Sequence, residues 1–113
     1  NAKTAAFWNE FPEMNHNELV GWAGGSADTA VVFFRDRGEY ERTARREDIS
    51  RNIISGHTSC IMDIFSEGDS HLEKIMYLIH LGDWASVFLA ELRGVDPVEV
   101  KVIDYLKSSL AKI

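Results

Sequence analysis

A histidine among polar side chains is the first candidate for chemistry in this sequence. His16 is flanked by carboxylate and amide groups, which belong to Glu13, Asn15, Asn17 and Glu18. Because an imidazole titrates near neutral pH, it can accept or give up a proton under ordinary conditions. Pro12 and the two asparagines interrupt regular structure, so we expect His16 to project from a loop or from the N-terminus of a helix that begins near residue 18.

Lys107, near the other end of the chain, is the second candidate. It follows Asp104 by three residues, a spacing that places both side chains on about the same face of a helix. Judged by its neighbours alone, Lys107 has the character of an ordinary surface lysine.

The histidines do not form a pattern that predicts a metal site. His57, His71 and His80 lack the His-Glu-x-x-His spacing and the companion cysteines of zinc proteins. His80 falls within an apolar helical stretch and is expected in a core or an interface, whereas His57 and His71 lie beside turns and are expected to be exposed. We therefore expect no metal and no cofactor.

Two other common chemistries lack their motifs. The sequence contains no Gly-x-Ser-x-Gly turn of the kind that carries a nucleophilic serine. The stretch Gly24-Gly25-Ser26-Ala27 is too short for a P-loop, and it leads into a predicted strand instead of out of one. If the substrate bears a phosphate, another segment must hold it.

Length and composition indicate one domain or part of one. The chain has 113 residues, and its apolar content of 45% excludes a disordered tail. A net charge of −6 argues against a nucleic-acid partner, which requires clustered cations. The mixed charges from Arg35 to Arg51 predict a solvated helix face, in which Glu39 or Glu41 pairs with Arg42, Arg45 or Arg46.

The sequence favours a soluble cytoplasmic protein with no membrane partner. The chain opens with Asn1-Ala2-Lys3, which resembles a cut start and not a signal peptide. Residues 75–90 are the longest apolar stretch, and they fall short of the roughly 20 residues that span a bilayer. The single cysteine, Cys60, cannot form an internal disulfide and is expected to pack as a small buried residue.

Two apolar runs predict the strands of a parallel sheet. Residues 29–34 and 58–65 are rich in β-branched and aromatic side chains, and both look buried on both faces. A helical pattern over residues 40–55, stopped by Gly56, connects them as a right-handed crossover of an α/β fold. Because two strands form only a marginal sheet, their partners must come from residues before Asn1 or from another chain.

Further helices are predicted on either side of this unit. Residues 71–93 are apolar nearly all round and predict a helix buried on more than one side, capped at Asp69 or Ser70 and ended by Gly94. Residues 98–113 predict a last helix. The segment 2–11 predicts the tail of a helix that starts upstream, and residues 24–26 predict a turn. The residues that mark the inner face of the long helix are Leu72, Ile75, Met76, Ile79, Val87, Phe88 and Leu92.

Several blocks of the sequence, taken in order, resemble one known family. They are Asn1-Ala2-Lys3, Phe7-Trp8-Asn9, residues 11–22, residues 81–87, Arg93-Gly94-Val95-Asp96-Pro97 and residues 103–107, and the most specific is Asn15-His16-Asn17-Glu18. Together they resemble the C-terminal half of the bifunctional phosphoglucose/phosphomannose isomerases of the sugar-isomerase (SIS) superfamily. The resemblance implies an α/β fold, a three-layer SIS-type (flavodoxin-like) parallel sheet with flanking helices, of which residues 1–113 are the C-terminal SIS-type domain.

The resemblance also implies a reaction, namely the reversible isomerisation of glucose 6-phosphate or mannose 6-phosphate to fructose 6-phosphate without a metal. In that family the residues matching His16 and Lys107 assist opening and closing of the sugar ring. A glutamate then moves a proton between C1 and C2, and by this alignment it falls immediately upstream of Asn1. Glu10, Glu13 and Glu18 are therefore expected to have structural or orienting roles.

The partners implied are the sugar phosphate, the N-terminal SIS domain of the same protein and a second copy in a homodimer. In the family, that N-terminal domain holds the phosphate, and the histidine acts across the dimer interface, so an isolated C-terminal half is expected to be inactive. Two alternatives stay open. One is a SIS module that binds sugar phosphate without turnover, and the other is a purely structural domain in which the helix over residues 71–93 packs subunits together.

Overall fold

The computed structural model describes residues 8, 10–11, 13–24 and 28–111. The chain divides into two compact units, Ala6–Ile79 and His80–Ile113 with Asn1–Ala5, and each is described by itself. The helix tail predicted over residues 2–11 and the turn predicted at residues 24–26 fall largely outside the described residues. The elements in chain order are α1 (Glu13–Asn17), the 3-10 helix η1 (Leu19–Gly24), β1 (Val31–Arg35), α2 (Glu41–Ile54), β2 (Ile61–Phe65), α3 (His71–Leu92) and α4 (Lys101–Leu110).

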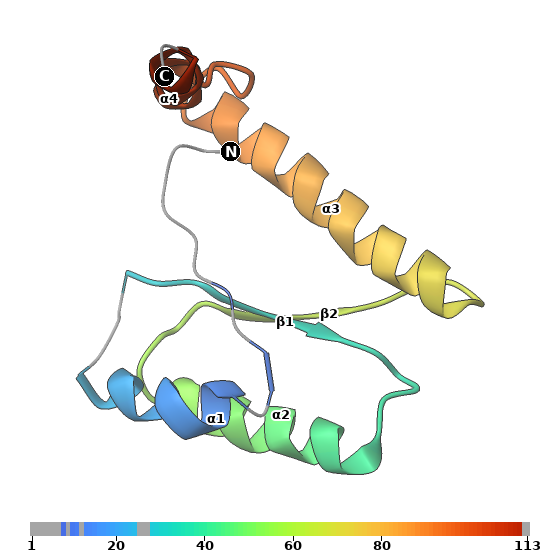
Figure 1. Cartoon of the computed structure of the whole chain (residues 1–113). Coiled ribbons are helices and arrows are strands. Elements are labelled where there is room, and N and C mark those ends of the chain that lie inside the picture. Colours follow the sequence, from blue (N-terminus) through green and yellow to red (C-terminus); the bar gives the residue numbers. More distant parts are fainter. Residues whose placement is uncertain (1–7, 9, 12, 25–27, 112–113) are drawn as a thin grey trace. The chain divides into compact units, whose positions relative to one another are not determined.

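A parallel strand pair forms the centre of the first unit. Val31 on β1 lies opposite Ile61 on β2, and Arg35 lies opposite Phe65. The crossover between the strands contains α2, and α1 lies beside α2 on the same side of the sheet (Figure 1). The predicted strand–helix–strand unit is confirmed, and it makes a mixed fold of helices with a small parallel sheet.

One face of this sheet is packed and the other is open within the described residues. Side chains alternate along a strand, so Phe33 points to the helix side, where it is only 6% exposed. Val32, Phe34 and Met62 lie on the opposite face and are all exposed. The prediction that both strands are buried on both faces is therefore wrong for this chain taken alone, because the described part of the unit leaves that face without a complete cover.

The alternation of side chains along a strand also explains why Cys60 is exposed, so its predicted burial is wrong. The residue lies just before β2, where its carbonyl accepts a hydrogen bond of 2.9 Å from the backbone N–H of Val31. Its side chain is exposed, and it lies two residues before Met62 on the open side of the sheet. Cys60 therefore contributes no buried core surface here.

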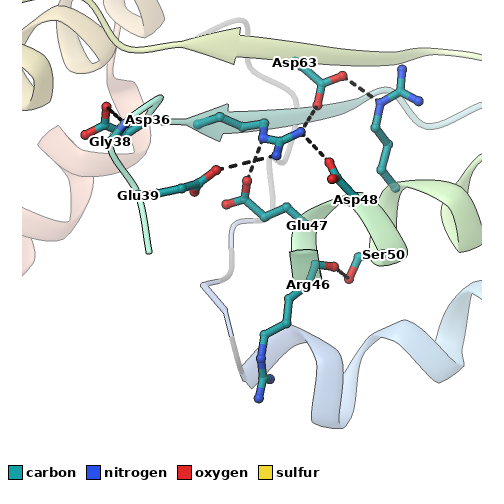
Figure 2. A network of polar contacts seen from close by, with 10 residues as sticks. Asp36, Gly38, Glu39, Arg46, Glu47, Asp48, Ser50 and Asp63 are labelled. Carbon is teal, nitrogen blue, oxygen red and sulfur yellow. Dashed lines mark hydrogen bonds and ion pairs between the residues drawn. The ribbon is translucent and has the colours of Figure 1, made fainter. Parts of the chain in front are cut away.

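Charged groups around Arg35 join the sheet to α2, and its partners Glu39, Glu47, Asp48 and Asp63 are labelled in Figure 2. Its guanidinium pairs with Glu47 at 2.8 Å, Asp48 at 2.9 Å, Glu39 at 3.5 Å and Asp63 at 3.7 Å. The predicted solvated face is thus wrong in two respects. Glu39 pairs with this arginine and not with one on the helix surface, and Glu47 is buried.

Ser70 and Glu73 begin α3 with a reciprocal pair of hydrogen bonds. The Ser70 hydroxyl accepts from the backbone N–H of Glu73 at 3.2 Å, while the Glu73 carboxylate accepts from the N–H groups of Asp69 at 2.9 Å and Ser70 at 2.7 Å. This capping box satisfies amides that have no partner inside the helix, and it confirms the predicted cap. These bonds also lower the pKa of Glu73, that from the Ser70 backbone most strongly.

Gly94 ends α3 as predicted, because its φ of 62° suits a residue without a side chain. The backbone N–H of Val95 bonds the carbonyl of Ala90 at 3.0 Å, and that of Gly94 bonds Glu91 at 3.0 Å, which together complete a Schellman motif. The last helix, α4, is also confirmed, although it begins at Lys101, three residues after the predicted start.

The surface of α3 differs from prediction. Among its residues only Ala90 is buried, and the predicted inner-face residues are exposed: Leu72, Ile75, Met76, Ile79, Val87, Phe88 and Leu92. A helix that is apolar nearly all round needs neighbours on several sides, and the described residues supply few of them. By length and composition alone α3 could also cross a membrane, a test that core helices of soluble proteins pass as well, so the prediction that this stretch is too short is wrong.

Candidate active-site residues

His16 lies in the last turn of α1 and its side chain is exposed. The prediction of a loop or a helix N-terminus is wrong. Backbone bonds of 3.0 Å from Met14 to Glu10 and of 3.1 Å from Glu18 to Met14 extend the helical path on both sides. The predicted interruption at Pro12 lies outside the described residues.

A hydrogen-bonded chain attaches α1 to α2. The side-chain amide of Asn15 donates to the hydroxyl of Ser50, and that hydroxyl donates to the carbonyl of Arg46 at 2.8 Å (Figure 2 shows the second bond). Ser50 is 0% exposed. The residue that precedes His16 is therefore held against the buried side of α2.

The glutamates near His16 are all exposed, namely Glu10, Glu13 and Glu18. The backbone carbonyls of Glu10 and Glu18 each accept a bond, from Met14 at 3.0 Å and from Gly21 at 2.9 Å. Their predicted structural or orienting role stays a prediction.

Lys107 lies in the last turn of α4, and its side chain is exposed. Asp104 precedes it on the same helix, and the Asp104 carbonyl accepts a bond of 2.6 Å from the Ser108 hydroxyl. The predicted helical placement of the two residues is confirmed. Because His16 belongs to the unit Ala6–Ile79 and Lys107 to the other unit, a cleft shared by the two side chains stays a prediction.

His80 accepts a hydrogen bond of 3.0 Å from the Trp84 indole N–H, and the two rings meet edge to face. The predicted core position of His80 is wrong for this chain alone, because the side chain is exposed, and the alternative of an interface position stays a prediction. His71 is exposed as predicted, whereas His57 is half-buried. Within the described ranges, no three His, Cys, Asp or Glu side chains lie close enough together to hold a metal ion.

Sequence reasoning missed Glu47, a buried carboxylate whose pKa is strongly raised. The pKa of Glu47 is raised to about 7, first by burial and then by the charge of Glu39, while the charge of Arg35 acts in the opposite direction. A signal was present in the spacing, since Glu47, Ser50 and Ile54 occupy one helix face and are the buried residues of α2. The apolar spacing that predicts this helix uses Ala44, Ile49 and Ile53 or Ile54. Of these isoleucines, Ile54 is buried, whereas Ile49 and Ile53 are exposed.

Known proteins resemble the chain along nearly its whole length. Residues 1–110 match the family described as the bacterial phospho-glucose isomerase C-terminal SIS domain. The bifunctional phosphoglucose/phosphomannose isomerase of Aquifex aeolicus is 40% identical over 114 residues, which cover 99% of this chain and 36% of that protein. The protein of the same name from Caldicellulosiruptor bescii is 41% identical over 116 residues, which cover 100% of this chain and 34% of that protein.

A third protein of this name, from Thermoplasma volcanium, is 37% identical over 98% of this chain and 36% of its own length. No solved structure matches the chain. The chain spans about a third of the length of these curated relatives. With the match over residues 1–110, these similarities confirm the resemblance found in the sequence. The chain belongs to the family of bacterial phospho-glucose isomerase C-terminal SIS domains.

Proposed function

We propose that this chain is the C-terminal domain of an aldose–ketose isomerase that interconverts glucose 6-phosphate or mannose 6-phosphate with fructose 6-phosphate. The observation that carries the proposal is the match over residues 1–110, together with identities of 40% and 41% to proteins named for both activities. The catalytic unit is the full-length protein, and the isolated chain is inactive because other segments supply the proton-shuttling glutamate and the phosphate site.

In this proposal His16 and Lys107 act on the sugar ring. Ring opening removes a proton from the anomeric hydroxyl and delivers one to the ring oxygen as the C1–O5 bond breaks. An imidazole can serve either transfer near neutral pH, and a lysine ammonium stabilises negative charge that develops on oxygen. The exposure of both side chains supports the assignment, since each can meet a ligand or another protein surface. Neither step requires a metal or an organic cofactor.

We also propose that the full-length protein has the three-layer, flavodoxin-like arrangement and works as a cytoplasmic homodimer with an N-terminal SIS domain. Two features support a larger assembly. The exposed face of the sheet at Val32, Phe34 and Met62 is apolar, and so is much of the exposed surface of α3. Apolar areas of this extent are normally covered in a folded protein.

A coupled assay on the full-length protein tests the function. Fructose 6-phosphate is supplied, and the glucose 6-phosphate formed is oxidised by its NADP-dependent dehydrogenase, so turnover appears as NADPH absorbance. Mannose 6-phosphate enters the same assay through fructose 6-phosphate. We expect turnover of both, undiminished by a chelator. Saturable binding without turnover would favour the non-catalytic SIS module, and a lack of binding would favour the purely structural domain.

A further inference from the structure

We propose that Ser50 on α2 is a positioning residue for His16 and acts through Asn15. This inference rests on the proposed role of His16 in ring opening. It adds a buried residue, 34 positions further along the chain, that sets the direction of the imidazole without touching the substrate.

The direction of the hydrogen bonds makes the contact specific. A hydroxyl has one hydrogen, and that of Ser50 is donated to the Arg46 carbonyl at 2.8 Å. Ser50 therefore offers only lone pairs to α1, so the end of the Asn15 amide that faces it must be the N–H donor. Ser50 is 0% exposed, which fixes its hydroxyl in place.

Helix geometry transmits this contact to the next residue. Successive side chains of an α-helix are about 100° apart around its axis. A contact that turns Asn15 toward α2 therefore turns His16 away from it, as the half-buried Asn15 and the exposed His16 show. Loss of the hydrogen bond between Asn15 and Ser50 would allow α1 to rotate about its axis, which would change the direction of the His16 imidazole.

The helix depends on such contacts because it has only five residues. A helix of that length is not stable in isolation. A second contact lies on its N-terminal side, where Phe11 stacks on Phe33 with ring centroids 6.2 Å apart. That contact holds the approach to α1, whereas the Asn15 contact sets its rotation.

The side-chain oxygen of Asn15 indicates that the contact with Ser50 serves more than stability. Asn15 Oδ1 is buried and has no hydrogen-bond donor among the described residues. An unsatisfied buried acceptor lowers stability, so stability alone would favour an apolar contact at this position. Such departures are expected where a side chain must be held in one orientation for function.

Ser50→Ala in the full-length protein removes the acceptor and leaves the backbone of α2 intact, since alanine is the better helix former. Ring opening is measured directly as enzyme-catalysed exchange between the α and β anomers of glucose 6-phosphate by NMR. We expect anomer exchange and kcat to fall roughly three- to tenfold, the range of a single hydrogen bond, with KM little changed. Ser55→Ala is the matched control, because Ser55 also donates to a carbonyl of α2, that of Asn52 at 2.7 Å, but is exposed.

A double variant separates positioning from a general structural role. If Ser50 acts through the imidazole, Ser50→Ala lowers anomer exchange in the natural protein and has no further effect in a His16→Ala background. An equal loss in both backgrounds overturns the proposal. So does unchanged exchange in Ser50→Ala when His16→Ala lowers it, a result that leaves the proposed function standing. Unchanged exchange in His16→Ala itself overturns the ring-opening role and this inference together.

Discussion

Arg35 on β1 and Glu47 on α2 form an ion pair with 2.8 Å between Nε and Oε2, at a place where Glu47 is 5% exposed. The pair joins the sheet to its crossover helix, and Glu39, Asp48 and Asp63 surround it with further negative charge. A second guanidinium, that of Arg51, pairs with Asp63 at 2.7 Å, so two cations face four carboxylates. The carboxyl of Glu47 is affected most clearly, because its pKa is raised to about 7, mainly by burial.

Glu47→Gln should reduce the dependence of stability on pH. The pKa of Glu47 rises from 4.5 to about 7 in the folded protein, so its contribution to stability is fully present below pH 4.5 and is lost as the pH rises to 7. The loss is at most about 3 kcal/mol. Urea denaturation of the full-length protein at pH 5 and pH 8 should show a smaller difference for Glu47→Gln. Glu41→Gln, on the exposed first turn of the same helix, should behave as the natural protein does; an unchanged difference in Glu47→Gln would refute the prediction.

Arg35→Met should destabilise the protein strongly at neutral pH. The substitution leaves the buried carboxylate of Glu47 without its cation, whereas the half-buried Asp63 keeps Arg51 at 2.7 Å. Removal of one partner from a buried pair costs about 3–5 kcal/mol. Lys101→Met provides the comparison, since Lys101 pairs with Glu99 at 2.6 Å but its side chain is 84% exposed. An exposed pair contributes less than about 1 kcal/mol. Equal shifts of the urea midpoint would show that burial does not govern the Arg35 cluster.

From β1 onward, the order of the elements followed from local patterns in the sequence. Continuous β-branched runs predicted β1 and β2, and Ser70 and Gly94 marked the ends of α3 because caps depend on nearby residues. The surroundings of each element did not follow. Apolar residues on all sides of α3 indicate that the helix needs neighbours, but they do not indicate which segments provide them. In this chain Phe88 and Leu92 are exposed.

Residue type and family resemblance predicted the residues of the candidate site. They did not predict which residues hold those side chains in place. His16 stood out because an imidazole among polar groups is chemically suggestive. Ser50 did not, since a serine within a helix has no local mark that distinguishes a buried acceptor from a solvated hydroxyl. Its role depends on Asn15, which is 35 residues away in sequence, and only folding brings such pairs together.

Gly68→Ala should weaken the start of α3. Gly68 has a φ of 132°, and an added Cβ would lie 2.6 Å from the Cβ of Glu73, whose carboxylate caps the helix. Residues with a side chain rarely adopt a φ of this size, and such a conformation costs about 1–3 kcal/mol before the clash is counted. Hydrogen–deuterium exchange over residues 71–79 should therefore be faster. Gly38→Ala is the control, because its nearest neighbour, Lys74 Nζ, would lie at an ordinary 3.7 Å; equal protection in the two variants would contradict the clash.

Lys107→Met should impair catalysis in the full-length protein while preserving its fold. The substitution keeps most of the length of the side chain in the exposed last turn of α4, so the helix should persist. If the ammonium stabilises charge on the sugar oxygen, its loss should reduce kcat about a hundredfold or more, as for removal of one preorganised donor. Lys101→Met removes the same charge from the start of the same helix and should leave kcat unchanged. The NADPH-coupled assay with fructose 6-phosphate measures both variants, and a similar kcat for the two would exclude Lys107 from the reaction.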